Sequence, residues 1–268
     1  MRRIRTPLAV LGALVAAALL APLLAPHNPA AQLDVLGNAL QAPSGAHWFG
    51  TDPYARDVFS RVLFGARSSL GIAMLAVTVA LTLGAAVGAV AALRGGWTDA
   101  VLMRGTDAAL AVPRLLLLLL VVASTGPLPA AWLAVVLGAT GWMTTARLVR
   151  QETRRLLTTE YVRAAIALGV RRRRLWSGHI LPGLLPTLGV AATVAFASAL
   201  PLEAALSFLG LGVRPPLASW GNIILEAEGR LQSAWWLVVF PTLAIVTATL
   251  AANLLAERMA AMHDVENQ

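Results

Sequence analysis

Long apolar runs separated by short polar segments dominate this chain. Six runs approach or exceed the roughly 20 residues that a helix needs to cross a bilayer, and the second and sixth carry no charged residue. This pattern predicts an all-α membrane protein with six transmembrane helices. The predicted spans are Pro7–Ala25, Ser69–Leu93, Ala108–Ser124, Pro129–Ala146, Gly183–Leu209 and Ala234–Ala256.

Three details modify the picture of six simple spans. Pro113 interrupts the third span and predicts a kink, with Arg114 reaching toward the lipid headgroups. Gly84 and Gly88, four residues apart in the second span, permit close approach of another helix. The first span follows a basic start and resembles a signal peptide, but its apolar run is long and a good cleavage site is missing. We therefore expect a retained anchor helix.

Composition supports a bilayer protein and excludes several chemistries. The 268 residues are 58% hydrophobic and 13% charged, against about 25% charged in soluble domains. The lack of cysteine excludes disulfides and thiolate chemistry, and four scattered histidines without an H-E-x-x-H pattern give no metal site. The chain has no lysine, which a phosphate-binding P-loop requires. We expect no cofactor in this chain, and any ATP-driven work, with its ATP and Mg²⁺, must depend on another polypeptide.

The arginines predict the orientation in the membrane. With the N-terminus inside, fifteen of the 21 arginines fall in inner segments and five in outer ones, and Arg114 lies within a span. This distribution follows the positive-inside rule and places both termini in the cytoplasm of a multi-pass inner-membrane protein. Asp99 and Asp107 are interpreted as solvated ends in the link between the second and third spans.

A basic segment of residues 147–182 separates the fourth and fifth spans. Within it, Glu160–Leu168 has helical periodicity, with one apolar stripe, and Gly169 is suited to a left-handed C-cap. The pattern predicts a short helix presented to a groove on another protein. The alternative is a basic loop lying on anionic membrane lipid. The stripe consists of Tyr161, Ala164, Ala165 and Leu168.

The spacing of Ala-Ala, Gly and Leu-Pro in this segment resembles the EAA loop of ABC importer permeases. That resemblance implies a type I importer fold and a cytoplasmic coupling helix, between spans 4 and 5, seated on the ATPase. Arg163 stands where the family usually has glutamate, and Glu160 is the other candidate for that contact. The implied ATPase-coupling residues are Glu160, Arg163, Ala164, Ala165, Gly169, Leu181 and Pro182.

Two further segments resemble the C-type permeases of dipeptide, oligopeptide and nickel importers. The first runs from Gly50 to Leu70, with Ala55 in place of the usual glycine, and the second from Glu203 to Asn222. The implied division is an N-terminal part, 1–67, with anchor helix, extracytoplasmic loop and interfacial helix, and a transmembrane domain, 68–268. The signature residues of the first segment are Gly50, Thr51, Asp52, Arg56, Asp57 and Arg61.

Charges in these two segments allow alternative interpretations. The i, i+4 pairs Asp52/Arg56 and Asp57/Arg61 favour a helix capped by Thr51 or Asp52, with solvated charges or with contacts to a partner. Glu203 is an acid within a span, and such acids usually face a cavity or a partner. It either lines the pathway, with Ser207 and Phe208 as neighbouring gate candidates, or makes a structural hydrogen bond.

Together these features predict a permease subunit that forms half of the pathway of an ATP-driven importer and performs no catalysis. The resemblance implies a B-type permease partner, one or two ATPases and an extracytoplasmic binding protein, and no nucleic acid. Short peptides are the expected cargo, with nickel chelates or another small solute as the alternative. An ion-coupled transporter would need inverted repeats, and an intramembrane enzyme a convergent catalytic pair. We recognise neither in the sequence.

Overall fold

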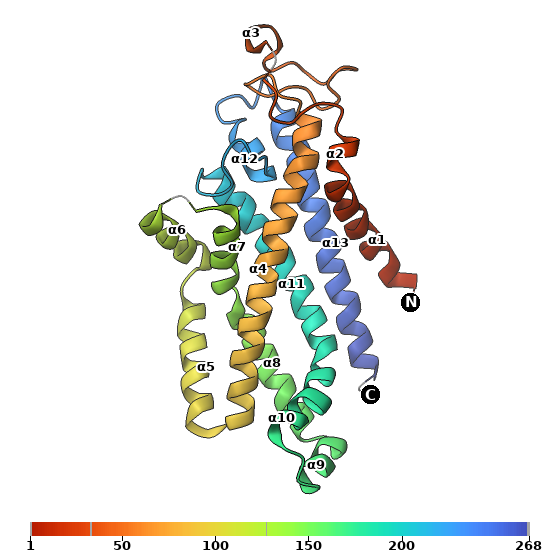
Figure 1. Ribbon diagram of the computed structural model, residues 1–268, viewed down its shortest axis with the longest axis vertical. Helices are drawn as coiled ribbons and strands as arrows, with labels where there is room; N and C mark the ends of the chain where they lie inside the picture. Colours follow the sequence, from red (N-terminus) through yellow and green to blue (C-terminus); the bar gives the residue numbers. More distant parts are fainter. Residues whose placement is uncertain (1, 33, 127, 267–268) are drawn as a thin grey trace.

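Three long helices form the centre of the molecule (Figure 1). They are α4 (Val58–Arg94), α11 (Leu181–Phe208) and α13 (Trp236–Glu266). The computed structural model describes residues 2–32, 34–126 and 128–266, and within these residues all named elements are helices. Each long helix is long and apolar enough to cross a membrane.

Two further pairs of helices are sharply bent. Helices α5 (Gly96–Ala111) and α6 (Arg114–Thr125) meet at 84°, and α7 (Ala130–Ala139) and α8 (Trp142–Leu157) meet at 45°. The first bend lies at Pro113 and confirms the predicted kink. Counting each bent pair as one span gives up to five spans by length and composition.

The first predicted span is divided into α1 (Arg2–Leu19) and the short α2 (Ala21–Leu24). The apolar part of α1, Ile4–Leu19, is shorter than a straight spanning helix needs. Helix α1 packs alongside α13 and α4 (Figure 1). A sixth span therefore stays a prediction.

Helices α4 and α8 pack most closely at the two glycines of α4. A Cβ atom on Gly88 would lie 2.3 Å from the carbonyl oxygen of Ala146, and one on Gly84 would lie 2.5 Å from the Cβ of Thr145. Neither position leaves room for a side chain, so the predicted helix contact is confirmed.

Short helices occupy the two ends of the bundle. Helix α9 (Glu160–Ala167) and helix α10 (Arg172–Leu175), which a π-helical turn (Trp176–Ile180) joins to α11, lie at one end. Helix α12 (Trp220–Leu225) and the segment containing α3 (Val35–Asn38) lie at the other (Figure 1). We call these the α9 end and the α12 end.

Candidate functional site

Helix α9 is held on the bundle by its inner face and ended by a glycine. Val162 and Ala165 are buried and pack in a cluster with residues of α8 and α11. Gly169 has φ +74°, its N–H donates to the Ile166 carbonyl at 3.0 Å, and the Val170 N–H donates to the Ala165 carbonyl at 3.1 Å. This bonding is a left-handed cap, as the sequence predicted.

The outer face of α9 leaves large apolar side chains uncovered. Tyr161 is 50% exposed, Ile166 49% and Leu168 85%. Ala164 is exposed beside them, whereas Ala165 points inward. The predicted stripe is therefore divided between two faces, because the helix must also bury residues against its own bundle.

The remaining predicted coupling residues lie near this face. Glu160 and Arg163 are both exposed on α9, so each is available to a partner. Leu181 is half-buried and Pro182 exposed in the first turn of α11, which continues the helix from α10. The structure thus brings these residues to the α9 end.

The arginines of the basic segment fall into two groups. Those on α8 are paired within the chain: Asp99 accepts hydrogen bonds from Arg150 and Arg154, at 2.7 Å in each case. Asp99 is buried, so its interpretation as a solvated helix end was wrong. The other group is exposed and makes no ion pair among the described residues: Arg163, Arg171, Arg173 and Arg174.

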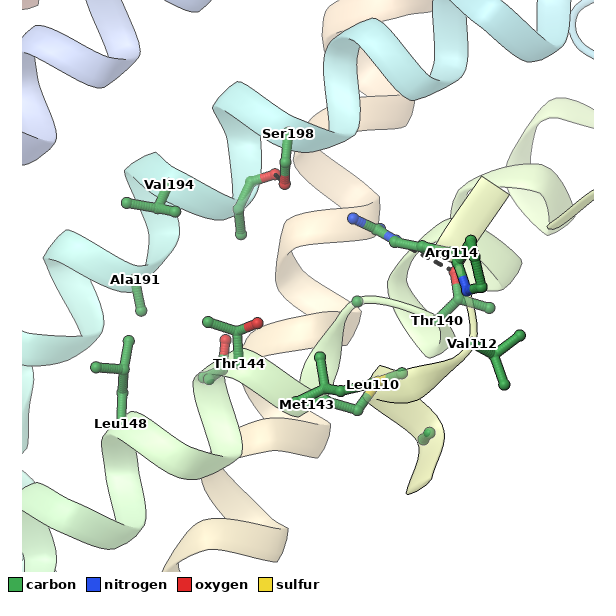
Figure 2. Close-up of a pocket in the computed structure, with 15 residues that line it drawn as sticks. Leu110, Val112, Arg114, Thr140, Met143, Thr144, Leu148, Ala191, Val194 and Ser198 are labelled. Carbon is green, nitrogen blue, oxygen red and sulfur yellow. Dashed lines mark hydrogen bonds between the residues drawn. The ribbon is translucent and has the colours of Figure 1, made fainter. Parts of the chain in front are cut away.

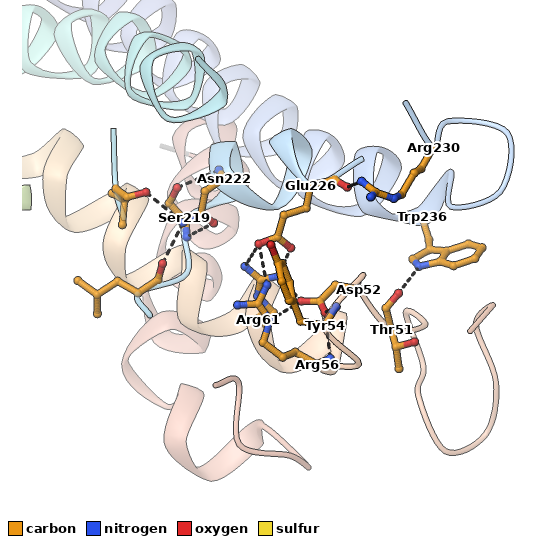
Figure 3. Close-up of polar contacts among 12 residues, drawn as sticks. Thr51, Asp52, Tyr54, Arg56, Arg61, Ser219, Asn222, Glu226, Arg230 and Trp236 are labelled. Atoms are coloured by element: carbon orange, nitrogen blue, oxygen red, sulfur yellow. Dashed lines mark hydrogen bonds and ion pairs between the residues drawn. The ribbon is translucent and has the colours of Figure 1, made fainter. Parts of the chain in front are cut away.

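At the α12 end, four buried or nearly buried charges form one cluster (Figure 3). Arg56 binds Asp52 at 2.7 Å and Glu226 at 2.7 Å, and Arg61 bridges the same two carboxylates. Glu226 is the residue at which α12 ends, and it lies 170 positions after Arg56 in the sequence. Two acids and two bases therefore neutralise each other and tie α4 to α12.

The predicted helix over this segment begins later than expected. Asp57 is the N-cap, with Oδ2 accepting from the Ser60 N–H at 2.8 Å, and helix α4 begins at Val58. The expectation of a cap at Thr51 or Asp52, of an Asp57/Arg61 pair and of solvated charges was wrong. Burial makes the Asp52 carboxylate bind the two arginines that the fold brings to it, and Asp57 accepts from the free backbone N–H of Ser60 in the first turn of α4.

Gly50 and Thr51 shape the turn that precedes the cluster. Gly50 has φ +74°, and a Cβ there would lie 2.5 Å from the Gln41 carbonyl oxygen. The indole N–H of Trp236 donates to the Thr51 carbonyl at 3.0 Å (Figure 3). The signature segment is therefore packed against the start of α13.

A cavity of about 920 Å³ opens beside the charge cluster. Tyr54, Arg56 and Glu226 line one part of it and Ser207 another. Ser207 donates to the Oε1 atom of Glu203 at 2.8 Å, and Glu203 is fully buried one helical turn away. Phe208 is 43% exposed at the end of α11.

A second cavity, of about 360 Å³, lies where both bent helix pairs break (Figure 2). Its lining is mainly apolar, with the hydroxyls of Thr140, Thr144 and Ser198 and the guanidinium of Arg114 among the polar groups. Arg114 donates from Nη2 to the Leu137 carbonyl at 2.6 Å. It therefore turns onto the end of α7 instead of extending toward headgroups as predicted.

The fold, with its long apolar helices, is that of an all-helical membrane component. Residues 84–264 match the family described as binding-protein-dependent transport system inner membrane component, and the chain belongs to this family. The comparison confirms the importer permease resemblance seen in the sequence.

Named relatives extend over most of the chain. It is 39% identical, over 82% of its length and 72% of the relative, to the dipeptide transport system permease protein DppC of Alkalihalophilus pseudofirmus. It is 38% identical, over 93% of its length and 82% of the relative, to a putative peptide permease protein of Brucella suis.

A solved structure has the same fold. A chain of the MetNI methionine ABC transporter, in an inward-facing conformation, superposes with a TM-score of 0.59 at 16% identity. The superposition covers 75% of this chain and 97% of that chain. It supports the helical fold for the part that it covers.

Proposed function

We propose that this chain is the permease subunit of an ATP-driven importer and forms half of a pathway for short peptides across the cytoplasmic membrane. The relatives at 38–39% identity are named as dipeptide or peptide permeases, which supports the cargo. The observation that carries the proposal is the exposed apolar face of α9. Tyr161, Ile166 and Leu168 are 50%, 49% and 85% exposed there, and a contiguous exposed apolar patch marks a site of interaction with another protein.

In this proposal, α9 is the coupling helix and docks into a groove on an ATPase, which binds ATP and Mg²⁺. The exposed arginines around it add positive charge to the docking surface. Their excess supports a cytoplasmic location of the α9 end and of both termini. Helix α1, extended by α2 to Leu24, crosses the membrane as the sixth span. A B-type permease completes the pathway, and an extracytoplasmic binding protein delivers cargo at the α12 end.

The two cavities lie on the proposed route. The cavity beside the charge cluster and Ser207, here called the outer cavity, receives the cargo. The second cavity, beside Arg114, is here called the inner cavity. It lies at the helix breaks, where a rearrangement of helices would open or close a path. Glu203 lies outside the lining of the outer cavity and, through its hydrogen bond, fixes the position of the Ser207 side chain that lines it. Broken helices lining a cavity are common at transport sites in membranes.

The test is to purify the transporter complex with the Ala164→Glu variant. This change places an acid on the exposed face of α9 without entering the core, so we expect the ATPase to be lost while the permease pair remains. Ala30→Glu, also exposed but at the α12 end, is the matched control and should retain the ATPase. Equal retention by both variants would contradict the docking role of α9.

Cargo is tested separately with the intact complex and its binding protein in liposomes. ATP-dependent uptake of labelled di- and oligopeptides, and no uptake of a nickel chelate, is the expected result. The reverse preference would leave the importer function standing and overturn the peptide assignment.

A further inference from the structure

Two histidines that lie in the segments before α4 approach one buried carboxylate at the α12 end. His27 and His47 have ring centroids 4.8 Å apart. The Nδ1 atom of His47 lies 2.9 Å from Oδ1 of Asp57, and the Nδ1 atom of His27 lies 3.8 Å from the same oxygen. The three ligand atoms all lie within 4.8 Å of one another.

Hydrogen bonding explains the position of His47 beside Asp57 but not that of His27. His47 can bond Asp57 directly, but 3.8 Å is too long for a hydrogen bond from His27. The Nδ1 atom of His27 is buried and has no hydrogen-bond partner among the described residues. A buried polar atom without a partner is costly, so the Nδ1 atom of His27 is available to a ligand that it would share with His47 and Asp57.

A divalent transition metal supplies that component. Zinc binds histidine nitrogen and carboxylate oxygen at about 2.0–2.2 Å, which corresponds to a spacing of about 3.4 Å between ligands in a tetrahedron. The two distances to Asp57 bracket that spacing, and all three ligand atoms lie within 4.8 Å of one another, so side-chain rotations can bring them to one metal ion.

The surroundings hold the ligands as a metal site requires. The Asp57 side chain is 1% exposed, and its other oxygen, Oδ2, accepts from the N–H of Ser60 at 2.8 Å and from its hydroxyl at 2.7 Å. The same hydroxyl accepts from the backbone N–H of His27 at 3.2 Å. Ser60 thus orients the Asp57 carboxylate, as outer groups do in metal sites, and holds the backbone of His27 beside it.

We propose that His27, His47 and Asp57 bind a zinc-like divalent cation at the α12 end. The His27 side chain is 37% exposed, which gives the ion a route in and leaves a fourth position for water or for an incoming ligand. Binding fastens the segment before α3, which carries His27, and the signature segment, which follows His47, to the first turn of α4.

The experiment uses the full chain, purified without a polyhistidine tag and held in lipid nanodiscs. Titration with Co²⁺, followed by its visible absorption, and displacement by Zn²⁺ should give one site per chain, which Mg²⁺ does not compete for. His27→Ala and His47→Ala should each weaken Zn²⁺ binding at least about 100-fold, since loss of a mere outer group costs about 10–100-fold. Ser60→Ala should fall in that smaller range.

His179→Ala is the matched control, because His179 also has a buried Nδ1 atom without a hydrogen-bond partner among the described residues but lies at the α9 end. It should bind Zn²⁺ like the unchanged chain. Absence of binding by the unchanged chain, or equal affinity in the His27 and His179 variants, would overturn the site. The His27 variant keeps the test decisive if the more buried His47 variant does not fold.

Discussion

The two ends of the bundle hold their charges in opposite ways. At the α12 end, Asp52, Arg56, Arg61 and Glu226 are withdrawn from solvent and bind each other. At the α9 end, the exposed arginines of α9 and α10 have no such pairs among the described residues, and Leu168 is 85% exposed. Charges that bind each other inside the chain connect its own segments and are not available to a partner, whereas an uncovered surface is.

Glu226→Gln breaks the α12 end and should have the largest effect. It leaves two buried arginines with one carboxylate, and removing one member of a buried ion pair costs about 3–5 kcal/mol. The free energy of unfolding in detergent measures the loss. Glu228→Gln, two residues away and exposed, is the control and should be nearly neutral. Similar losses in the two variants would show that the cluster contributes no special stability.

Gly169→Ala tests how far the α9 end depends on its own backbone. An alanine at φ +74° is strained by about 1–2 kcal/mol, so the cap after α9 should weaken by that amount. A lower free energy of unfolding and faster amide hydrogen exchange in α9 would show the weaker cap. Gly178→Ala, at a glycine with ordinary φ and open space around it, should not destabilise; a loss there equal to that at Gly169 would argue against the cap.

Asp99→Asn probes the paired arginines of α8, which lie between the two extremes. Arg150 and Arg154 are 28% and 46% exposed, so water compensates them when the carboxylate charge is removed. We expect a loss of about 1 kcal/mol or less, again from unfolding in detergent. Asp107→Asn, whose partner Arg147 is 52% exposed, is the control and should have no measurable effect. If Asp99→Asn lost more stability than Glu226→Gln, the ranking of the two ends would be reversed.

Leu168→Ser should have the smallest effect on stability and a large one on assembly. The side chain is so exposed that the free energy of unfolding should change by less than about 0.5 kcal/mol. If α9 docks on an ATPase, ATPase retention on purification should fall sharply. A stable variant that retains its ATPase would show that Leu168 lies outside the contact.

Local patterns explain why much of this molecule could be predicted from its sequence. Apolar length predicted the long helices, Pro113 predicted a bend and Gly169 predicted a cap, because each depends on a few neighbouring residues. The family assignment followed in the same way from short motifs with fixed spacing, and the comparisons confirm it.

Contacts between distant residues explain what the sequence could not show. Glu226 joins Arg61 across 165 positions, and nothing near Glu226 in the sequence marks it as a partner. The same limit applies to His27 and Asp57, which the packing of a segment without regular structure brings together. The i, i+4 spacing of Asp57 and Arg61 suggested a helix pair, yet Asp57 bonds the helix start and Arg61 bonds the more distant acids.

One continuous helix connects the two ends. From Arg173 through the π turn to Phe208 it runs 36 residues, or about 54 Å at 1.5 Å per residue, with no loop to absorb movement. A displacement of the exposed end beside α9 is therefore transmitted along the helix axis. The helix can bend at Pro186 and Pro201, and Pro201 lies two residues before Glu203. In the proposed complex, motion of an ATPase bound to α9 would therefore change the tilt of this helix beneath the cavity beside Ser207.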